Sequence, residues 1–117
     1  MKYILLLALT ATGLMADATG KWTGTLTPDG GEGEGPALLV LKQDGTTLTG
    51  TAGPADSEQH EVLHGKIEDG KITFEVIFGE ATLKFSLTQE GEEIKGGVTL
   101  ERGGETKTAK LAVKRQS

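Results

Sequence analysis

The chain has 117 residues, no cysteine, 36% hydrophobic and 25% charged residues, and a formal charge of −5. This length fits one domain, and the lack of cysteine excludes disulfides, thiolate zinc sites and thiol nucleophiles. The acidic balance argues against a nucleic-acid partner, because phosphate binding depends on clustered lysine and arginine.

The N-terminal segment has the layout of a secretory signal peptide. Lys2 gives a positive start, an unbroken apolar run follows, and small residues lead to Ala16 as the expected cleavage site. Gly13 marks an alternative cleavage site, and an ordinary N-terminal helix is the alternative interpretation. The apolar run is too short for a membrane span, which needs about 20 residues. We therefore predict a signal peptide at 1–16, a single domain at 17–117, and a secreted or periplasmic location.

The rest of the chain predicts an all-β domain. Turn signals such as Asp44-Gly45 and Asp69-Gly70 recur at short intervals, and between them apolar and polar residues alternate with the period of half-buried strands. Because the connections are short, strands adjacent in sequence should pair as antiparallel hairpins. The expected fold is an eight-stranded antiparallel up-and-down barrel. Its strands are expected at about 20–27, 36–43, 46–53, 60–68, 71–78, 81–89, 92–101 and 105–115.

Four of these strands repeat an apolar-x-Gly-x-apolar pattern on the apolar phase. The glycines are Gly24, Gly50, Gly65 and Gly96. Glycine destabilises a strand interior, so its recurrence on one face indicates the tight coiling that closes a narrow barrel.

The apolar phase of the strands is expected to point inward. This phase includes Leu63. It also includes Phe74, Phe78 and Phe85, and the rings of these three phenylalanines are expected to occupy the interior. An eight-stranded barrel has room only for side chains or one small ligand, and these residues favour a filled interior. The alternative is an outer-membrane barrel with the apolar phase toward lipid, but the sequence is 4% aromatic, too few for aromatic girdles.

The first strand resembles that of the calycin superfamily, which includes lipocalins and avidins. Thr19-Gly20-Lys21-Trp22-Thr23 is similar to the Gly-x-Trp start of that group, and Leu48-Thr49-Gly50-Thr51 is similar to the third strand of avidins. The resemblance implies a lipocalin-like barrel in which a basic residue near the last strand's end packs over the tryptophan, a part that Arg115 fits by cation–π contact. Gly20, Trp22 and Arg115 are therefore expected to be structural.

Biotin binding does not follow from this resemblance. Avidin-like sites need several tryptophans, and Trp22 is the only one in the chain. Ala52 stands where avidins have a third-strand tyrosine.

The segment His60-Glu61-Val62-Leu63-His64 matches the H-E-x-x-H motif of zinc peptidases. That motif works on a helix, where both histidines share one face. On a strand, which rises ~3.3 Å per residue, the two histidines stand about 13 Å apart, too far to share one ion. We interpret them as exposed strand residues and keep a zinc peptidase as the disfavoured alternative.

Other chemical motifs are weaker. No serine lies in a Gly-x-Ser-x-Gly elbow, and the paired acids cluster at predicted turns, where they are solvated. The loop from Asp29 to Gly35 offers carboxylates of the type that bind calcium, but we interpret it as a hairpin loop. It should flank the open mouth of the barrel, so a ligand is expected to enter beside it.

These observations predict a non-enzymatic, monomeric binding or interaction module with no cofactor, metal or catalytic residues. Its partner is expected to be a small apolar ligand or an extracytoplasmic protein; a purely structural barrel with a filled core is the other alternative. If the barrel is hollow, the expected wall residues are Leu39, Leu48, Phe74, Phe85 and Leu100.

Overall fold

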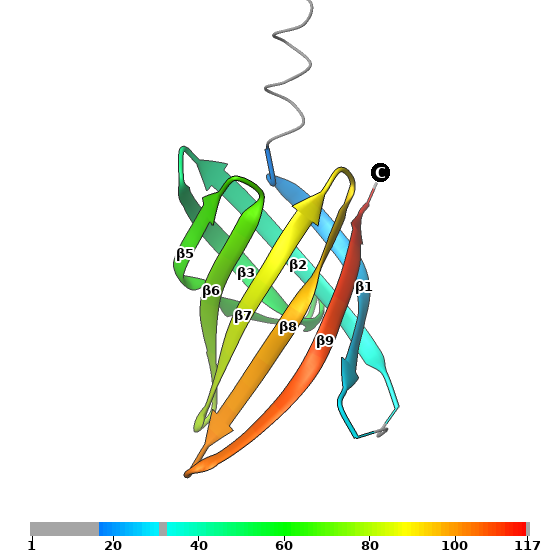
Figure 1. The fold of residues 1–117 in the computed structure, drawn as a ribbon, viewed down its shortest axis with the longest axis vertical. Helices are drawn as coiled ribbons and strands as arrows, with labels where there is room; N and C mark the ends of the chain where they lie inside the picture. Colours follow the sequence, from blue (N-terminus) through cyan, green and yellow to red (C-terminus); the bar gives the residue numbers. More distant parts are fainter. Residues whose placement is uncertain (1–16, 31–32, 117) are drawn as a thin grey trace, which may run out of the picture.

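A computed structural model describes residues 17–30 and 33–116 (Figure 1). The predicted signal peptide at 1–16 lies outside the described residues. Among the described residues there is no helix with the length and apolar character needed to cross a membrane. The strands are β1 (Gly20–Pro28), β2 (Gly35–Asp44), β3 (Thr47–Ala55), β4 (Glu58–Glu61), β5 (Leu63–Glu68), β6 (Lys71–Phe78), β7 (Ala81–Glu90), β8 (Glu93–Arg102) and β9 (Glu105–Arg115).

The strands form one antiparallel sheet that closes on itself. From β5 to β9 each strand pairs with the next, β9 pairs with β1, and β2 pairs with both β1 and β3. Both β4 and β5 pair with β3, so they are two halves of one interrupted barrel strand. The predicted eight-stranded antiparallel up-and-down barrel is therefore confirmed.

The prediction of one continuous strand over 60–68 is wrong. This strand is interrupted at Val62, the backbone φ of His64 is +53°, and the pairing of β5 with β6 shifts register between Leu63 and Lys66. An extra residue in a strand reverses the inward and outward phases on its two sides. Val62 is consequently 5% exposed and belongs to the core, while Leu63, expected inside, is only half-buried.

The interruption leaves a seam in the barrel wall. Among the described residues, no backbone ladder joins β4 to β6, and the pairing of β6 with this side of the barrel stops at Glu75 opposite Leu63. Beyond this point the rings of His60 and Phe78 complete the barrel wall, and the seam lies at the end of the barrel opposite the start of β1 and the end of β9.

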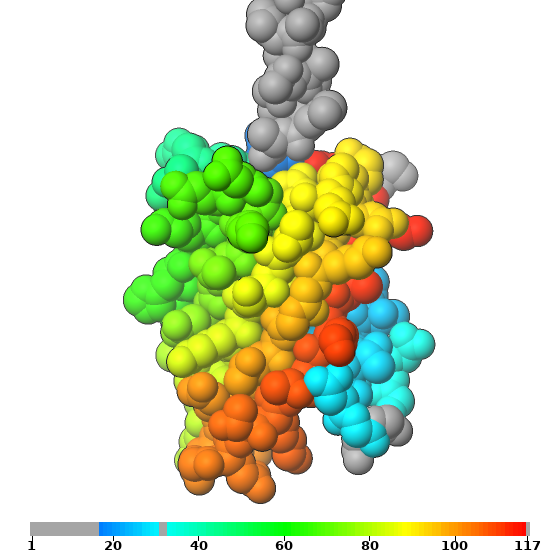
Figure 2. Space-filling view, viewed as in Figure 1, coloured from blue at the N-terminus to red at the C-terminus, as the bar shows by residue number. Residues whose placement is uncertain are grey.

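The apolar phase of the strands points into the barrel, as predicted. Trp22, Ile72 and Ile94 have no exposed surface, and threonine, lysine and glutamate cover the outside. Figure 2 shows this outer surface over β6 to β9. Phe78, expected to occupy the interior, is instead 42% exposed at the end of β6.

Leu38 is a second departure, because it is buried although it belongs to the outer phase of β2. Lys21 on β1 contacts Asp56 in the turn after β3, with 3.9 Å between Nζ and Oδ1. Gln59 on β4 also donates to the backbone oxygen of Leu38 at 3.3 Å, so the β3–β4 hairpin lies against β2 at Leu38.

The four inward glycines lie where a neighbouring strand approaches closely. A Cβ on Gly24 would overlap the carbonyl oxygen of Ala112 on β9, and one on Gly96 would overlap that of Ser86 on β7. Gly50 and Gly65 face carbonyl oxygens of β2 and β3 in the same way. These positions therefore need glycine because the barrel is tightly coiled there.

The two ends of the barrel differ (Figure 1). The C-terminus and the described start of the chain lie at one end, with the β7–β8 turn. The β1–β2 loop and the β6–β7 and β8–β9 turns lie at the other, where the β8–β9 hairpin projects farthest.

Candidate ligand-binding site

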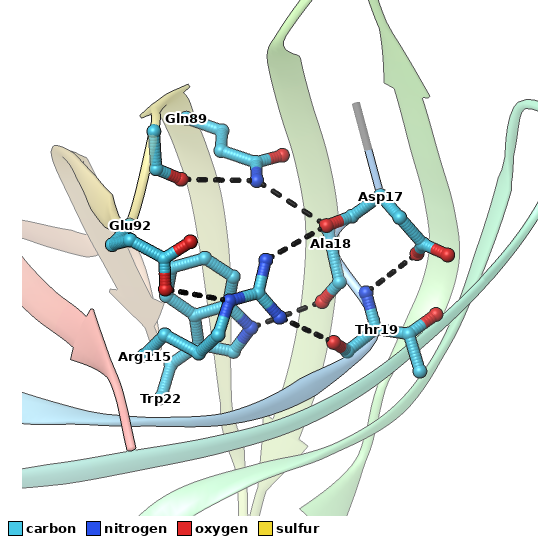
Figure 3. Close-up of polar contacts among 8 residues, drawn as sticks. Asp17, Ala18, Thr19, Trp22, Gln89, Glu92 and Arg115 are labelled. Carbon is cyan, nitrogen blue, oxygen red and sulfur yellow. Dashed lines mark hydrogen bonds and ion pairs between the residues drawn. The ribbon is translucent and has the colours of Figure 1, made fainter. Parts of the chain in front are cut away.

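One end of the barrel is closed by Trp22 and Arg115 (Figure 3). The indole Nε1 donates to the backbone oxygen of Ala18 at 2.9 Å, which ties the start of the chain over the buried ring. The guanidinium carbon of Arg115 lies 4.4 Å from the ring centroid. This is the contact that the family resemblance implied for these two residues.

Arg115 also holds the segment before β1. Its two terminal nitrogens donate to the backbone oxygens of Thr19, at 2.6 Å, and Asp17, at 2.9 Å, while Nε donates to Glu92 at 3.0 Å. Gly20 is adjacent: its φ is +140°, and a Cβ there would lie 3.0 Å from the guanidinium. A larger residue would thus be strained in its backbone and would press on Arg115.

The Asp17 carboxylate turns back on its own segment. Its Oδ1 accepts a hydrogen bond of 2.8 Å from the backbone N–H of Thr19. Hydrogen bonds from the side chain and backbone of Thr19, together with the positive charge of Arg115, hold the pKa of Asp17 below its ordinary value of 3.8. Among the described residues, this end of the barrel is thus covered by a polar network centred on Arg115.

A cavity of about 230 Å³ lies toward the opposite end. Its lining residues Leu26 and Pro36 flank the β1–β2 loop, and others come from β4 and β6 on the two sides of the seam. Its wall is apolar except at Glu58 and His60. The lining residues are Leu26, Pro36, Ala37, Leu39, Ala52, Gly53, Pro54, Glu58, His60, Val76, Phe78, Leu83, Phe85 and Leu111.

The five predicted wall residues are distributed differently. Leu39 and Phe85 line the cavity. Leu48 and Phe74 are buried in the core but do not line it, although Phe74 stacks on Phe85 with 4.4 Å between ring centroids. Leu100 is half-buried on β8, also outside the lining. The phenylalanine pair therefore forms packed core beside the hollow instead of filling it.

The rim at the seam is made by two residues for which the sequence predicts other places, His60 on the exposed face and Phe78 in the interior. The rings of His60 on β4 and Phe78 on β6 meet edge to face with centroids 4.8 Å apart, so they bridge the gap in backbone pairing. His60 Nε2 is buried, has no hydrogen-bond partner among the described residues, and lies 3.7 Å from Glu58 Oε2. His60 and Val62 are two residues apart, so their side chains lie on the same face of the strand. The apolar Val62 is therefore the one feature of the sequence which indicates that His60 points inward.

The interpretation of both histidines as exposed is therefore wrong for His60. The segment carrying H-E-x-x-H forms two strands, so the two histidines do not share a helix face. His60 lines the cavity, whereas His64 is exposed beside a surface hollow over β6, β7 and β8. Among residues 17–30 and 33–116, no group of three histidine or acidic side chains is arranged to hold a metal.

The β1–β2 loop was the other candidate cation site. The carboxylate of Asp29 contacts Lys110, with 3.7 Å between Oδ1 and Nζ, and accepts a hydrogen bond from the Thr108 hydroxyl. These contacts join the loop to β9. Residues 31–32 lie outside the described part of the chain.

Comparison with protein-family models, curated proteins and solved structures gives no match for this chain. The structural class of the protein is accordingly defined by its fold and cavity alone: it is a closed eight-stranded antiparallel barrel, covered at one end by Trp22 and Arg115, with a cavity toward the other end.

Proposed function

We propose that the chain is an exported, lipocalin-like binding protein whose cavity holds one small apolar ligand. The observation that carries the proposal is the cavity of about 230 Å³, walled by apolar side chains and open at one end. Such a cavity exceeds the ~150 Å³ hollow that binds benzene in an engineered protein, and it is smaller than the ~300 Å³ at which typical ligand pockets begin. The size favours a compound somewhat larger than benzene.

Ligand binding is tested by a methyl-detected NMR titration with ethylbenzene. We expect saturable shifts at Leu26, Ala37 and Val76, which line the cavity. Ala37→Phe adds a ring within the cavity and should abolish the shifts. Thr25→Phe adds the same ring to an exposed position on β1 and should leave them intact. Shifts that are absent, or that persist in Ala37→Phe, would contradict the proposal.

Export is the second part of the proposal. Residues 1–16 have the signal-peptide layout, and Arg115 binds the backbone oxygen of Asp17, the first residue after the expected cut. A mature chain that begins at Asp17 keeps every contact of the closed end. Intact-mass measurement of protein recovered outside the cytoplasm should therefore give a chain starting at Asp17. A chain starting at Leu14 would support the alternative cleavage site, and retention of Met1 would contradict processing.

A further inference from the structure

We propose that the cavity's ligand is a small apolar amine, held with its hydrocarbon body inside the barrel and its protonated nitrogen at Glu58 and His60. This inference rests on the proposed binding function and adds the chemical class of the ligand. It is carried by the charge at the rim and by the buried Nε2 of His60, which has no hydrogen-bond partner within the described part of the chain.

The charge at the rim selects against an acid. Among the described residues that line the cavity, Glu58 is the only aspartate, glutamate, lysine or arginine. A ligand carboxylate would therefore face a like charge with no lysine or arginine to offset it, whereas an ammonium group would face an opposite charge. Glu58 is half-exposed and lies on the short strand β4, so it stands where a ligand would enter.

The nitrogen of His60 selects for a hydrogen-bond donor. A buried polar atom without a partner is unfavourable, and such atoms are uncommon in folded proteins. His60 Nε2 accepts a hydrogen bond when the imidazole carries its proton on Nδ1. It lies 3.7 Å from Glu58 Oε2, too far for the two to satisfy each other. An ammonium group has three donors, so it can serve both acceptors at once.

The aromatic residues at the rim suit the same ligand. The rings of Phe78 and His60 pack nearly perpendicular to each other, and both Phe78 and Phe85 line the cavity. Phenyl faces attract cations as well as apolar groups. An amine on a single ring or a short chain thus matches the cavity in size, polarity and charge.

The test uses four compounds that share one phenyl body: ethylbenzene, phenethyl alcohol, phenethylamine and phenylacetate. Dissociation constants are measured by calorimetry or NMR at neutral pH on the mature chain. We expect phenethylamine to bind about tenfold more tightly than ethylbenzene or the alcohol, and phenylacetate to bind most weakly. Equal or tighter binding of the acid or the alcohol would overturn the inference.

Two variants locate the nitrogen of the ligand. Glu58→Gln should weaken phenethylamine roughly fivefold and leave ethylbenzene within about twofold, as for an ion pair near the surface. His60→Phe should likewise remove most of the preference for the amine over ethylbenzene. Glu61→Gln is the matched control, because Glu61 is exposed on the same strand and does not line the cavity. An amine preference that survives both Glu58→Gln and His60→Phe would overturn the inference.

The outcomes separate the two proposals. If ethylbenzene binds and the amine has no advantage, the binding function stands and the ligand class is wrong. If none of the four compounds binds, the binding function fails, and the ligand class fails with it.

Discussion

Arg115 lies directly opposite Trp22 in the pairing of β9 with β1, and its guanidinium carbon lies 4.4 Å from the centre of the Trp22 ring. The register of the first and last strands therefore brings together the two side chains that close the barrel. The same guanidinium binds the backbone oxygens of Asp17 and Thr19, so one side chain both covers Trp22 and holds the segment before β1 in place.

Arg115→Lys should lower the free energy of unfolding by about 2 kcal/mol. The substitution keeps the charge but loses the planar fork that serves three acceptors and stacks on the indole. Urea denaturation followed by Trp22 fluorescence measures this loss. Lys114→Ala is the control, because the Lys114 ammonium is exposed and makes only a long ion pair, 3.9 Å from Glu93. Removing such a pair should change the free energy of unfolding by less than about 0.5 kcal/mol. Equal effects of the two substitutions would contradict the special role of Arg115.

Gly96→Ala should destabilise the chain and Gly97→Ala should not, although the two residues are adjacent on β8. A Cβ at Gly96 would overlap Ser86 O and the Cα of Leu87, whereas one at Gly97 would meet nothing within 4 Å. We expect Gly96→Ala to destabilise by about 2–3 kcal/mol, as overpacking does. Gly97→Ala should be neutral or stabilise by up to about 1 kcal/mol, because alanine restricts the unfolded chain. The midpoints of urea denaturation give both values, and a tolerated Gly96→Ala would show that the strands do not coil as tightly as described.

The Asp17 carboxyl should make stability depend on pH on the acid side. Its pKa is lower in the folded chain than the ordinary 3.8, so its contribution is fully present above that value and is lost as the pH falls through the folded pKa. Between pH ~5 and ~2, wild type should therefore lose more stability than Asp17→Asn. Thermal unfolding across this range provides the comparison, with Asp44→Asn as an exposed control on β2. Parallel curves for wild type and Asp17→Asn would contradict the lowered pKa.

The sequence predicts the barrel well because a closed barrel requires a regular pattern of residue types along each strand. Alternation with period two identifies the inner face, and glycines such as Gly24 and Gly96 occur on that face where neighbouring strands approach. These features are local in the chain, so a single sequence contains them.

The site was harder to predict, because it depends on one irregular residue. His64 adopts a positive φ that the sequence does not signal, because the adjacent Gly65 fits the repeated inward-glycine pattern of a regular strand. The resulting shift of phase turns Val62 and His60 inward. The volume of the cavity also depends on how the side chains pack against one another, which the alternation of residue types does not determine. Phe74 and Phe85 stack on each other instead of spreading across the interior, and Phe78 lies at the rim.

Zinc should not form a tight one-to-one complex with the chain. His60 lines the interior cavity and His64 is exposed outside the barrel, so the two imidazoles of H-E-x-x-H cannot close on one ion without rebuilding the seam. Calorimetric titration with zinc should give only weak binding that is similar in wild type, His60→Ala and His64→Ala. A stoichiometric site lost in both variants would contradict this arrangement.

His60→Phe should stabilise the ligand-free chain by about 1 kcal/mol. The substitution removes a buried nitrogen that has no partner among the described residues and keeps an aromatic ring against Phe78 at the seam. His64→Phe is the matched control: His64 is exposed at a positive φ, so the same change there should give no gain. Chemical denaturation of the two variants beside wild type measures the difference. A gain in stability in His60→Phe is the result expected if the His60 nitrogen is retained for ligand binding, because polar groups kept for function commonly lower the stability of the ligand-free protein. If His60→Phe is less stable than wild type, the nitrogen contributes to folding and its unpaired state cannot be assigned to a ligand.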